Sequence, residues 1–177
     1  RQVDPSASGG PKGASAWSVK TAGVATVDAT AAAGVWYVYQ AYPWYKGVRG
    51  NDCRTARAVR LAEVANLRPN ASIDAVELAW DLPIAAATVR IFRGKGASPK
   101  LRKTPSGWAP AEASTTAYDA TQPGGWRDGR VEEGGRYHYR IVVDFGSGAV
   151  SEGVEAIVDV PRRPDPASAL AAVFRQE

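Results

Sequence analysis

An internal repeat is the feature that most limits what this chain can fold into. Residues 28–34 read DATAAAG, and they align with the pieces DAT (119–121) and VEEG (131–134) once the nine residues 122–130 are set aside as a loop. The offset is 91 residues before that loop and 100 after it, and it aligns Ser15 with Ser106, Trp17 with Trp108, Tyr37 with Tyr137 and Tyr39 with Tyr139. Self-similarity at a fixed offset marks repeated structural units, so the 177-residue chain is predicted to hold two copies of one module.

The second copy shows the alternation that is typical of β strands. AVELAW (75–80) places Val76, Leu78 and Trp80 on one face, and ATVRIFR (87–93) does the same with Val89 and Ile91. Further strands are predicted in STTAYDA (114–120), RYHYRIVV (136–143) and GVEAIVDV (153–160), with turn formers such as RPNAS, RGKGASP, QPGGWRDG and DFGSG between strands. No segment between residues 62 and 160 has a helical period, so an all-β, antiparallel β-sandwich is predicted.

These segments resemble a fibronectin type III module. The resemblance rests on VANLRP leading into VELAW, then on VRIFR, and then on AYDAT followed by GGRYHYRIVV. Trp80 ends the second strand of that pattern, Asp119 lies in a short turn, and Tyr137 and Tyr139 lie on the sixth strand. The resemblance implies a fibronectin type III/immunoglobulin-like fold for a complete module over residues 62–161.

The first copy is predicted to be incomplete. Residue 1 aligns with about residue 92, so residues 15–61 would supply only the later strands of a module. Half a sandwich leaves an apolar face uncovered, here with Tyr37, Tyr39, Val59 and Leu61 as its expected members. Residues 1–14, a flexible lead, are too polar to cover it. A protein partner or a preceding segment of the same polypeptide is therefore expected to complete this module; the alternative is that the neighbouring copy holds the half-module in place.

The end of the chain is predicted to be a connector. Residues 162–177 begin as a proline-rich spacer and continue as a short helix, with Asp165 as its N-cap and Pro166 at its first position. Leu170, Val173 and Phe174 would then lie on one face of that helix.

Two groups of residues are candidate binding sites. The aromatic residues Trp36, Tyr42, Trp44 and Tyr45 point away from the predicted core or follow the strand, so they either bind a partner or are covered by the missing half or by the loop that follows. No acidic residue lies between Leu82 and Ala111, and a polyanion-binding stripe there would comprise Arg90, Arg93, Lys95, Lys100, Arg102 and Lys103. The alternative is that these cations protect a sheet edge from pairing.

Catalysis, metal binding and cofactor binding find no support in the sequence. One cysteine, Cys53, and one histidine, His138, cannot form a disulfide or a structural zinc site, and His138 is expected on the outer face of a strand. There is no apolar run long enough to span a membrane. The net charge of +4 permits polyanion binding without requiring it.

The predicted function is that of a non-catalytic interaction or spacer region in a larger bacterial multidomain protein, with tandem modules that make protein–protein contacts. The alternative is a module that binds a carbohydrate through exposed aromatics or an anionic polymer through the basic stripe. The absence of disulfides leaves the compartment open: a cytoplasmic location is slightly favoured, and a secreted or cell-surface location is the alternative.

Overall fold

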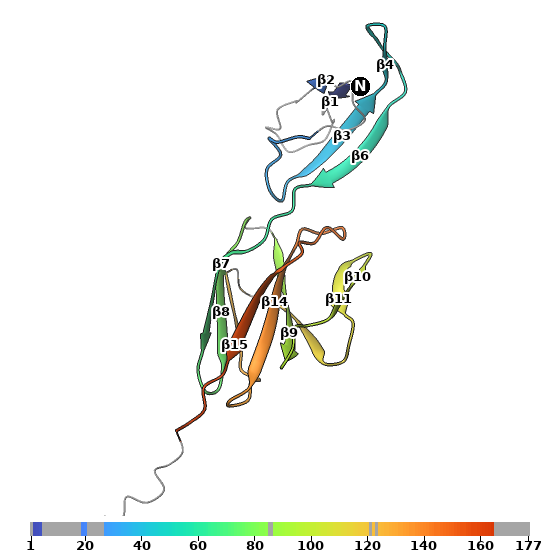
Figure 1. Cartoon of the computed structure of the whole chain (residues 1–177). Helices are drawn as coiled ribbons and strands as arrows, with labels where there is room; N and C mark the ends of the chain where they lie inside the picture. Colours follow the sequence, from blue (N-terminus) through green and yellow to red (C-terminus); the bar gives the residue numbers. More distant parts are fainter. Residues whose placement is uncertain are drawn as a thin grey trace, which may run out of the picture.

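The computed structural model describes residues 2–4, 19–20, 27–84, 87–120, 122 and 124–164. Every regular element in this part of the chain is a β strand. The strands form two groups joined by the short segment 60–64, with β1–β6 on one side of it and β7–β15 on the other (Figure 1). The helix predicted after Asp165 lies outside the described residues.

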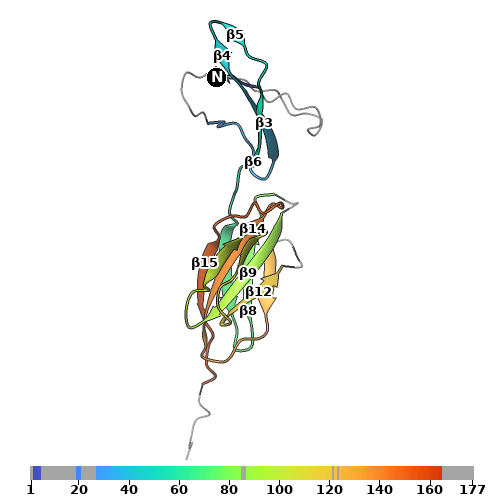
Figure 2. The same ribbon diagram turned by 90° about the vertical axis from the view of Figure 1, so that its right-hand side faces the viewer.

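The second group, which we name the C-terminal sandwich (65–160), consists of two antiparallel sheets and a hairpin (Figure 2). The three-stranded sheet has the order β13-β8-β7, with bounds Gly125–Asp128, Val76–Asp81 and Ala65–Ala71. The four-stranded sheet has the order β12-β9-β14-β15, with bounds Thr115–Asp119, Thr88–Lys95, Arg136–Asp144 and Val154–Asp159. This arrangement confirms the predicted antiparallel β-sandwich.

The core of the sandwich is built from the alternating residues that the sequence predicts. Trp80 on β8 is 2% exposed, and Tyr137 and Tyr139 on β14 are 2% and 0% exposed. They share one cluster with Val76, Leu78, Val89, Ile91, Ile141, Val143, Val158 and other apolar side chains. Since burial of apolar area is the main favourable term in folding, this cluster provides the stability that disulfides do not.

Three parts of the sandwich differ from the sequence prediction. Strand β7 includes residues 68–71, which belong to the predicted turn RPNAS, because these residues pair with β8. Strand β13 lies inside QPGGWRDG, which was expected to be a turn, because its pairing with β8 comes from a distant part of the chain. The hairpin of β10 (Leu101–Thr104) and β11 (Gly107–Pro110) lies in the basic segment that follows β9. Its Trp108 packs against a second small cluster that includes Phe92 and Val142, and Trp108 Nε1 donates a hydrogen bond to the carbonyl oxygen of Ser151 at 2.8 Å.

The first group, which we name the N-terminal sheet, has the strand order β2-β1-β3-β6. The bounds are Val19–Lys20, Gln2–Asp4, Trp36–Tyr42 and Arg54–Val59. The sequence predicts a flexible lead over residues 1–14, but Gln2–Asp4 pair with both β3 and β2. A strand of three residues is too short to show alternation, which is why the sequence does not reveal it.

The pairing of β3 with β6 matches the pairing of β14 with β15 residue for residue. Trp36 lies opposite Val59, and Arg136 lies opposite Asp159, so each residue number in the second pair is 100 higher. Strand β1 meets β3 as β9 meets β14, since Val3 lies opposite Ala41 and Ile91 lies opposite Ile141. The four strands of the N-terminal sheet therefore occupy the places of β12, β9, β14 and β15.

No described residue of the N-terminal sheet forms a counterpart of the sheet β13-β8-β7. Burial reflects this difference. Tyr37 and Tyr39 are half-buried and Ala56 and Ala58 are exposed, whereas the residues at the equivalent places in the sandwich are all buried. The prediction that Val59 belongs to the same face is wrong, because Val59 lies opposite Trp36 and cross-strand neighbours share a face. Leu61, 45% exposed, follows β6 in the segment that joins the two groups.

Candidate interaction surface

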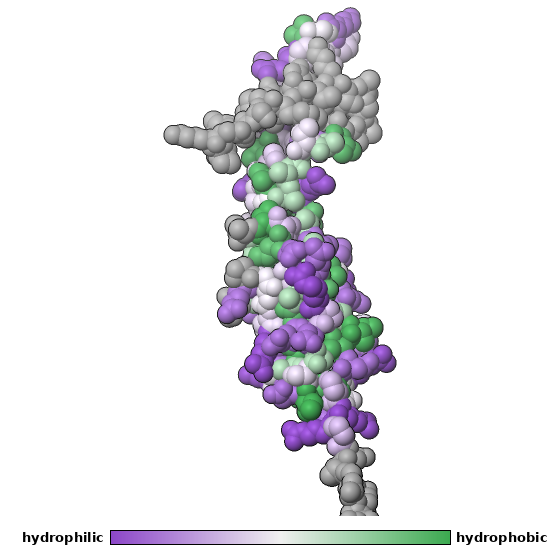
Figure 3. All heavy atoms as spheres, turned by 90° about the vertical axis from the view of Figure 1, so that its left-hand side faces the viewer, coloured by the Kyte–Doolittle hydropathy of each residue, from purple (hydrophilic) through white to green (hydrophobic). Residues whose placement is uncertain are grey.

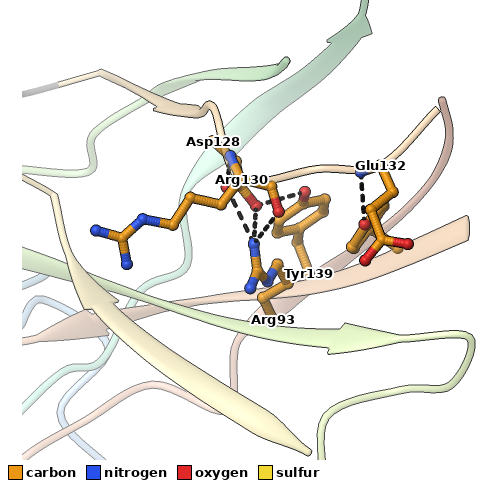
Figure 4. Close-up of polar contacts among 6 residues, drawn as sticks. Arg93, Asp128, Arg130, Glu132 and Tyr139 are labelled. Atoms are coloured by element: carbon orange, nitrogen blue, oxygen red, sulfur yellow. Dashed lines mark hydrogen bonds and ion pairs between the residues drawn. The ribbon is translucent and has the colours of Figure 1, made fainter. Parts of the chain in front are cut away.

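A buried polar cluster ties the two sheets of the sandwich together (Figure 4). Nη1 of Arg93, on β9, donates to both carboxylate oxygens of Asp128, on β13, at 3.1 and 2.9 Å. The hydroxyl of Tyr139, on β14, donates to Oδ2 of Asp128 at 3.0 Å, and the backbone N–H of Arg130 donates to Oδ1. Asp128 is only 2% exposed. A carboxylate this buried needs such a set of donors, because an unpaired charge in the interior is strongly unfavourable.

Two tyrosines of the sandwich complete this arrangement. The hydroxyl of Tyr137 accepts a hydrogen bond from the backbone N–H of Glu132 at 2.8 Å. Burial raises the pKa of Tyr139 far above its ordinary value, and the neighbouring Asp128 carboxylate raises it further. Tyr139 therefore stays a neutral donor over the whole physiological pH range.

The N-terminal sheet repeats these contacts with residue numbers 100 lower. The Tyr39 hydroxyl donates to Oδ2 of Asp28 at 3.1 Å, and the backbone N–H of Thr30 donates to Oδ1 at 2.9 Å. The backbone N–H of Ala32 donates to the Tyr37 hydroxyl at 2.9 Å. Asp28 thus occupies the place of Asp128, and the predicted equivalence of Asp28 with Asp119 is wrong. The short sequence match DAT put the gap between the two copies at the wrong position, because the hydrogen bonds of the aspartate cannot be read from the sequence.

The two carboxylates differ in their surroundings. The hydrogen bond from the Thr30 hydroxyl, at 2.6 Å, lowers the pKa of Asp28, and burial together with Asp28 raises the pKa of Tyr39 to about 12. No described cation forms an ion pair with Asp28, whereas Asp128 has Arg93 at 2.9 Å. By strand register, Tyr37, Tyr39 and Ala41 of β3 share one face of the sheet with Ala56 and Ala58 of β6, and we name these five residues the open face. The Tyr39 hydroxyl reaches Asp28 from this face.

The four aromatic residues predicted to bind a partner are not gathered at one place. Trp36, at the start of β3, donates from Nε1 to the carbonyl oxygen of Phe145 in the sandwich at 3.2 Å. Tyr42, at the end of β3, has the guanidinium of Arg49 4.5 Å from its ring centre. Trp44 and Tyr45 form β4, which pairs with β5 (Val48–Arg49). Trp44 is half-buried and Tyr45 is 73% exposed. Partner binding by these residues stays a prediction.

Trp36 belongs to a contact between the two groups of strands. Apolar residues gather on the visible surface where the N-terminal sheet meets the sandwich (Figure 3). Gly34 has a φ of 71° and lies so close to the sandwich that an added Cβ would overlap Cδ1 of Ile84 and come within 3.1 Å of Cε1 of Phe145. Its N–H donates to the carbonyl oxygen of Arg60 at 2.9 Å, which ties the joining segment to the N-terminal sheet.

Gly34→Ala is expected to disturb this contact, with Gly47→Ala as a matched control. Gly47 has a φ of 82°, so both alanines carry a similar backbone strain of about 1 kcal/mol, but the Cβ of residue 47 would meet nothing within 4 Å. We expect Gly34→Ala to shift the NMR signals of Ile84 and Phe145 and to change the residual dipolar couplings between the two groups. Equal effects of the two substitutions on these signals would contradict this contact.

The structure pairs four of the six predicted polyanion-binding cations with acidic residues. Arg90 lies 3.5 Å from Asp119 and 3.6 Å from Asp144, Lys95 lies 2.6 Å from Glu132, and Lys100 lies 2.7 Å from Glu112, in addition to the pair of Arg93 with Asp128. Arg102 is exposed on β10, and Nζ of Lys103 lies 5.5 Å from the ring centre of Trp108. The interpretation of the stripe as edge protection is wrong for β9, which has neighbouring strands on both sides.

Arg93 is the residue whose role the sequence reasoning missed. It was grouped with the surface cations, although it alternates with Val89 and Ile91 and so points to the core. Its side chain is 17% exposed. A cation at an inward position of a buried strand indicates that a buried carboxylate lies elsewhere in the sequence. In this chain that carboxylate belongs to Asp128.

The remaining candidates are isolated. Nδ1 of His138 lies 3.4 Å from the Ser98 hydroxyl, and Cys53 is exposed with Sγ 3.8 Å from the Thr55 hydroxyl. Within the described residues, histidine, cysteine and acidic side chains form no group of three that could hold a metal ion. The described part of the chain also contains no helix of the length and hydropathy needed to cross a membrane.

Comparison with known proteins finds solved structures of low similarity among those that match. No family model and no curated protein matches the chain. Among solved structures, a redesigned β-sandwich protein is 16% identical with a TM-score of 0.45, over 58% of this chain and 97% of the other. The fourth fibronectin type III domain of a human protein is 18% identical with a TM-score of 0.37, over 61% and 85%. The FN1–FN3 domains of chicken CNTN1 are 12% identical with a TM-score of 0.39, over 92% and 56%.

These likenesses carry no argument about function, because both the identities and the TM-scores are low. The sandwich assignment rests on the chain's own sheets, which contain three and four antiparallel strands. This architecture agrees with the resemblance of residues 62–161 to a fibronectin type III module.

Proposed function

We propose that this chain is a non-catalytic interaction and spacer region, built from tandem fibronectin type III-like modules of a larger bacterial protein. In this proposal, protein–protein contacts are made through the open face of the N-terminal sheet. The observation that carries the proposal is the match between the open face and the buried face of the sandwich. The two faces share strand register and the contact between an aspartate and a tyrosine, but only one has a covering sheet among the described residues.

Elementary packing physics favours a partner at this face. A sheet with one apolar face gains its stability by burying that face against a second layer. In the sandwich the second layer reduces the exposure of Tyr139 to 0% and of Ala156 to 8%. The equivalent Tyr39 is half-buried and Ala56 is exposed. A protein partner that supplies strands would bury this area and would also satisfy backbone groups along the strand edges.

The spacer role is supported by the short connection between the two groups of strands. Strand β6 ends at Val59 and β7 begins at Ala65. Trp36 donates a hydrogen bond to Phe145, and a Cβ added at Gly34 would lie only 3.1 Å from the Phe145 ring, so the connection is more than a flexible tether. The alternative function, binding of a carbohydrate or of an anionic polymer, has less support because acidic residues already pair with four of the six cations.

The proposal is tested by photo-crosslinking in the cells that make the protein. A photoreactive amino acid at position 58, on the open face, should form crosslinks to a partner protein. The same amino acid at position 55, which is also exposed but lies on the opposite face of β6, should not. Ala58→Asp should weaken partner binding about a hundredfold or more, because docking would bury a second carboxylate on the face that already carries Asp28, whereas Thr55→Asp should have little effect. Equal crosslinking from the two positions, or none from position 58, would overturn the proposal.

A further inference from the structure

We propose that the open face is covered by an antiparallel β segment of another polypeptide chain that carries two features. It places large apolar side chains at alternating positions over Tyr37 and Tyr39, and it brings a basic side chain to Asp28. This inference rests on the proposed function and specifies the chemistry of the partner for that same face.

The apolar feature follows from the strand that covers the equivalent face in the sandwich. Strand β8 places Val76, Leu78 and Trp80 in the same core cluster as Tyr137 and Tyr139. Its Val76 lies directly opposite Asp128 in the pairing with β13. An incoming strand that pairs in the same way with the backbone around Asp28 would set its alternate residues over Tyr37 and Tyr39.

The basic feature follows from the burial of the Asp28 carboxylate that a covering strand would cause. A covering strand would bury Asp28 as Asp128 is buried, and a buried carboxylate is retained only when it is fully paired. Tyr39 and Thr30 already donate to Asp28, but the described residues hold no cation there. In the proposed complex, the partner supplies this cation.

Two synthetic peptides derived from this chain provide the probe. The first has the sequence of residues 64–82, which contains β7 and β8, and the second is the same peptide with Val76→Arg. Residue 76 is chosen because it lies opposite Asp128, so the arginine would lie opposite Asp28 in the docked peptide. Binding of each peptide to the full 177-residue chain is measured by titration calorimetry.

We expect the arginine peptide to bind at least about tenfold more tightly than the valine peptide, since a desolvated charge pair is worth more than one exposed to water. This advantage should disappear in Asp28→Asn, which keeps the shape of the side chain and removes its charge. Ala58→Asp should abolish the binding of both peptides, because a single arginine cannot pair with two buried carboxylates, and Thr55→Asp should not.

Each result separates the parts of the proposal. Equal affinity of the two peptides, or an advantage of the arginine peptide that survives Asp28→Asn, would overturn the basic feature. If neither peptide binds, the strand-like occupant is overturned. The proposed function would still be decided by the crosslinks from position 58, because those do not depend on either peptide.

Discussion

Asp128→Ala is expected to lower the free energy of unfolding of the C-terminal sandwich by about 3–5 kcal/mol. The substitution removes the acceptor of two hydrogen bonds from Arg93 and of one from Tyr139. The guanidinium of Arg93, 17% exposed, would then lie in the protein interior without a counter-ion. Urea denaturation followed by tryptophan fluorescence measures the change. A loss below about 1 kcal/mol would show that the pair is not a structural link between the sheets.

The chain provides a matched control for this prediction at Asp28. Asp28 makes the same contacts with a tyrosine hydroxyl and with the N–H two residues later, but it has no ion pair among the described residues. Asp28→Ala should leave the unfolding of the sandwich unchanged. Replacing Arg93 and Asp128 together by apolar residues of similar size should restore part of the lost stability, because the desolvation of both charges is removed as well.

The sequence predicted those parts of the fold in which local pattern and tertiary environment agree. The alternation of Val76, Leu78 and Trp80 identified β8, and the tyrosines of β14 were correctly assigned to the core. Strand β13 and the hairpin of β10 and β11 were missed, because their segments are rich in glycine and proline and their strand character comes from partners distant in sequence.

The sequence predicted an uncovered face on the N-terminal copy, but the structure changes which residues belong to that face. Tyr37 and Tyr39 were correctly placed on one face of β3, because alternate residues of a strand point to the same side whichever strands lie beside it. Val59 was misplaced, because the register between two strands decides which residues share a face. The equivalence of Asp28 and Asp128 became visible only through the tyrosine hydroxyls that both carboxylates accept from. Bacterial origin stays a prediction from the sequence.

Trp80→Ala is expected to destabilise the sandwich by about 3–5 kcal/mol, which is the usual range for truncation of a large buried aromatic side chain. Trp80 is 2% exposed and packs in the cluster that joins the two sheets. Its Nε1 has no hydrogen-bond partner in the described structure, so the loss comes from packing and from the cavity that remains. Trp80→Phe should therefore cost less, about 1–2 kcal/mol, because it keeps part of the volume and removes an unsatisfied donor.

The matched control for Trp80 is Tyr45→Ala, since Tyr45 is an aromatic residue with 73% of its surface exposed. Its truncation should change the free energy of unfolding by less than about 0.5 kcal/mol.

Residues 62–161, which contain both sheets of the sandwich and its whole cluster, should unfold in one cooperative transition when expressed alone. The Trp80→Ala loss should be the same in this fragment and in the full chain, because every member of the cluster among the described residues lies between Val64 and Val160. A larger loss in the fragment would mean that the N-terminal sheet contributes to the stability of the sandwich.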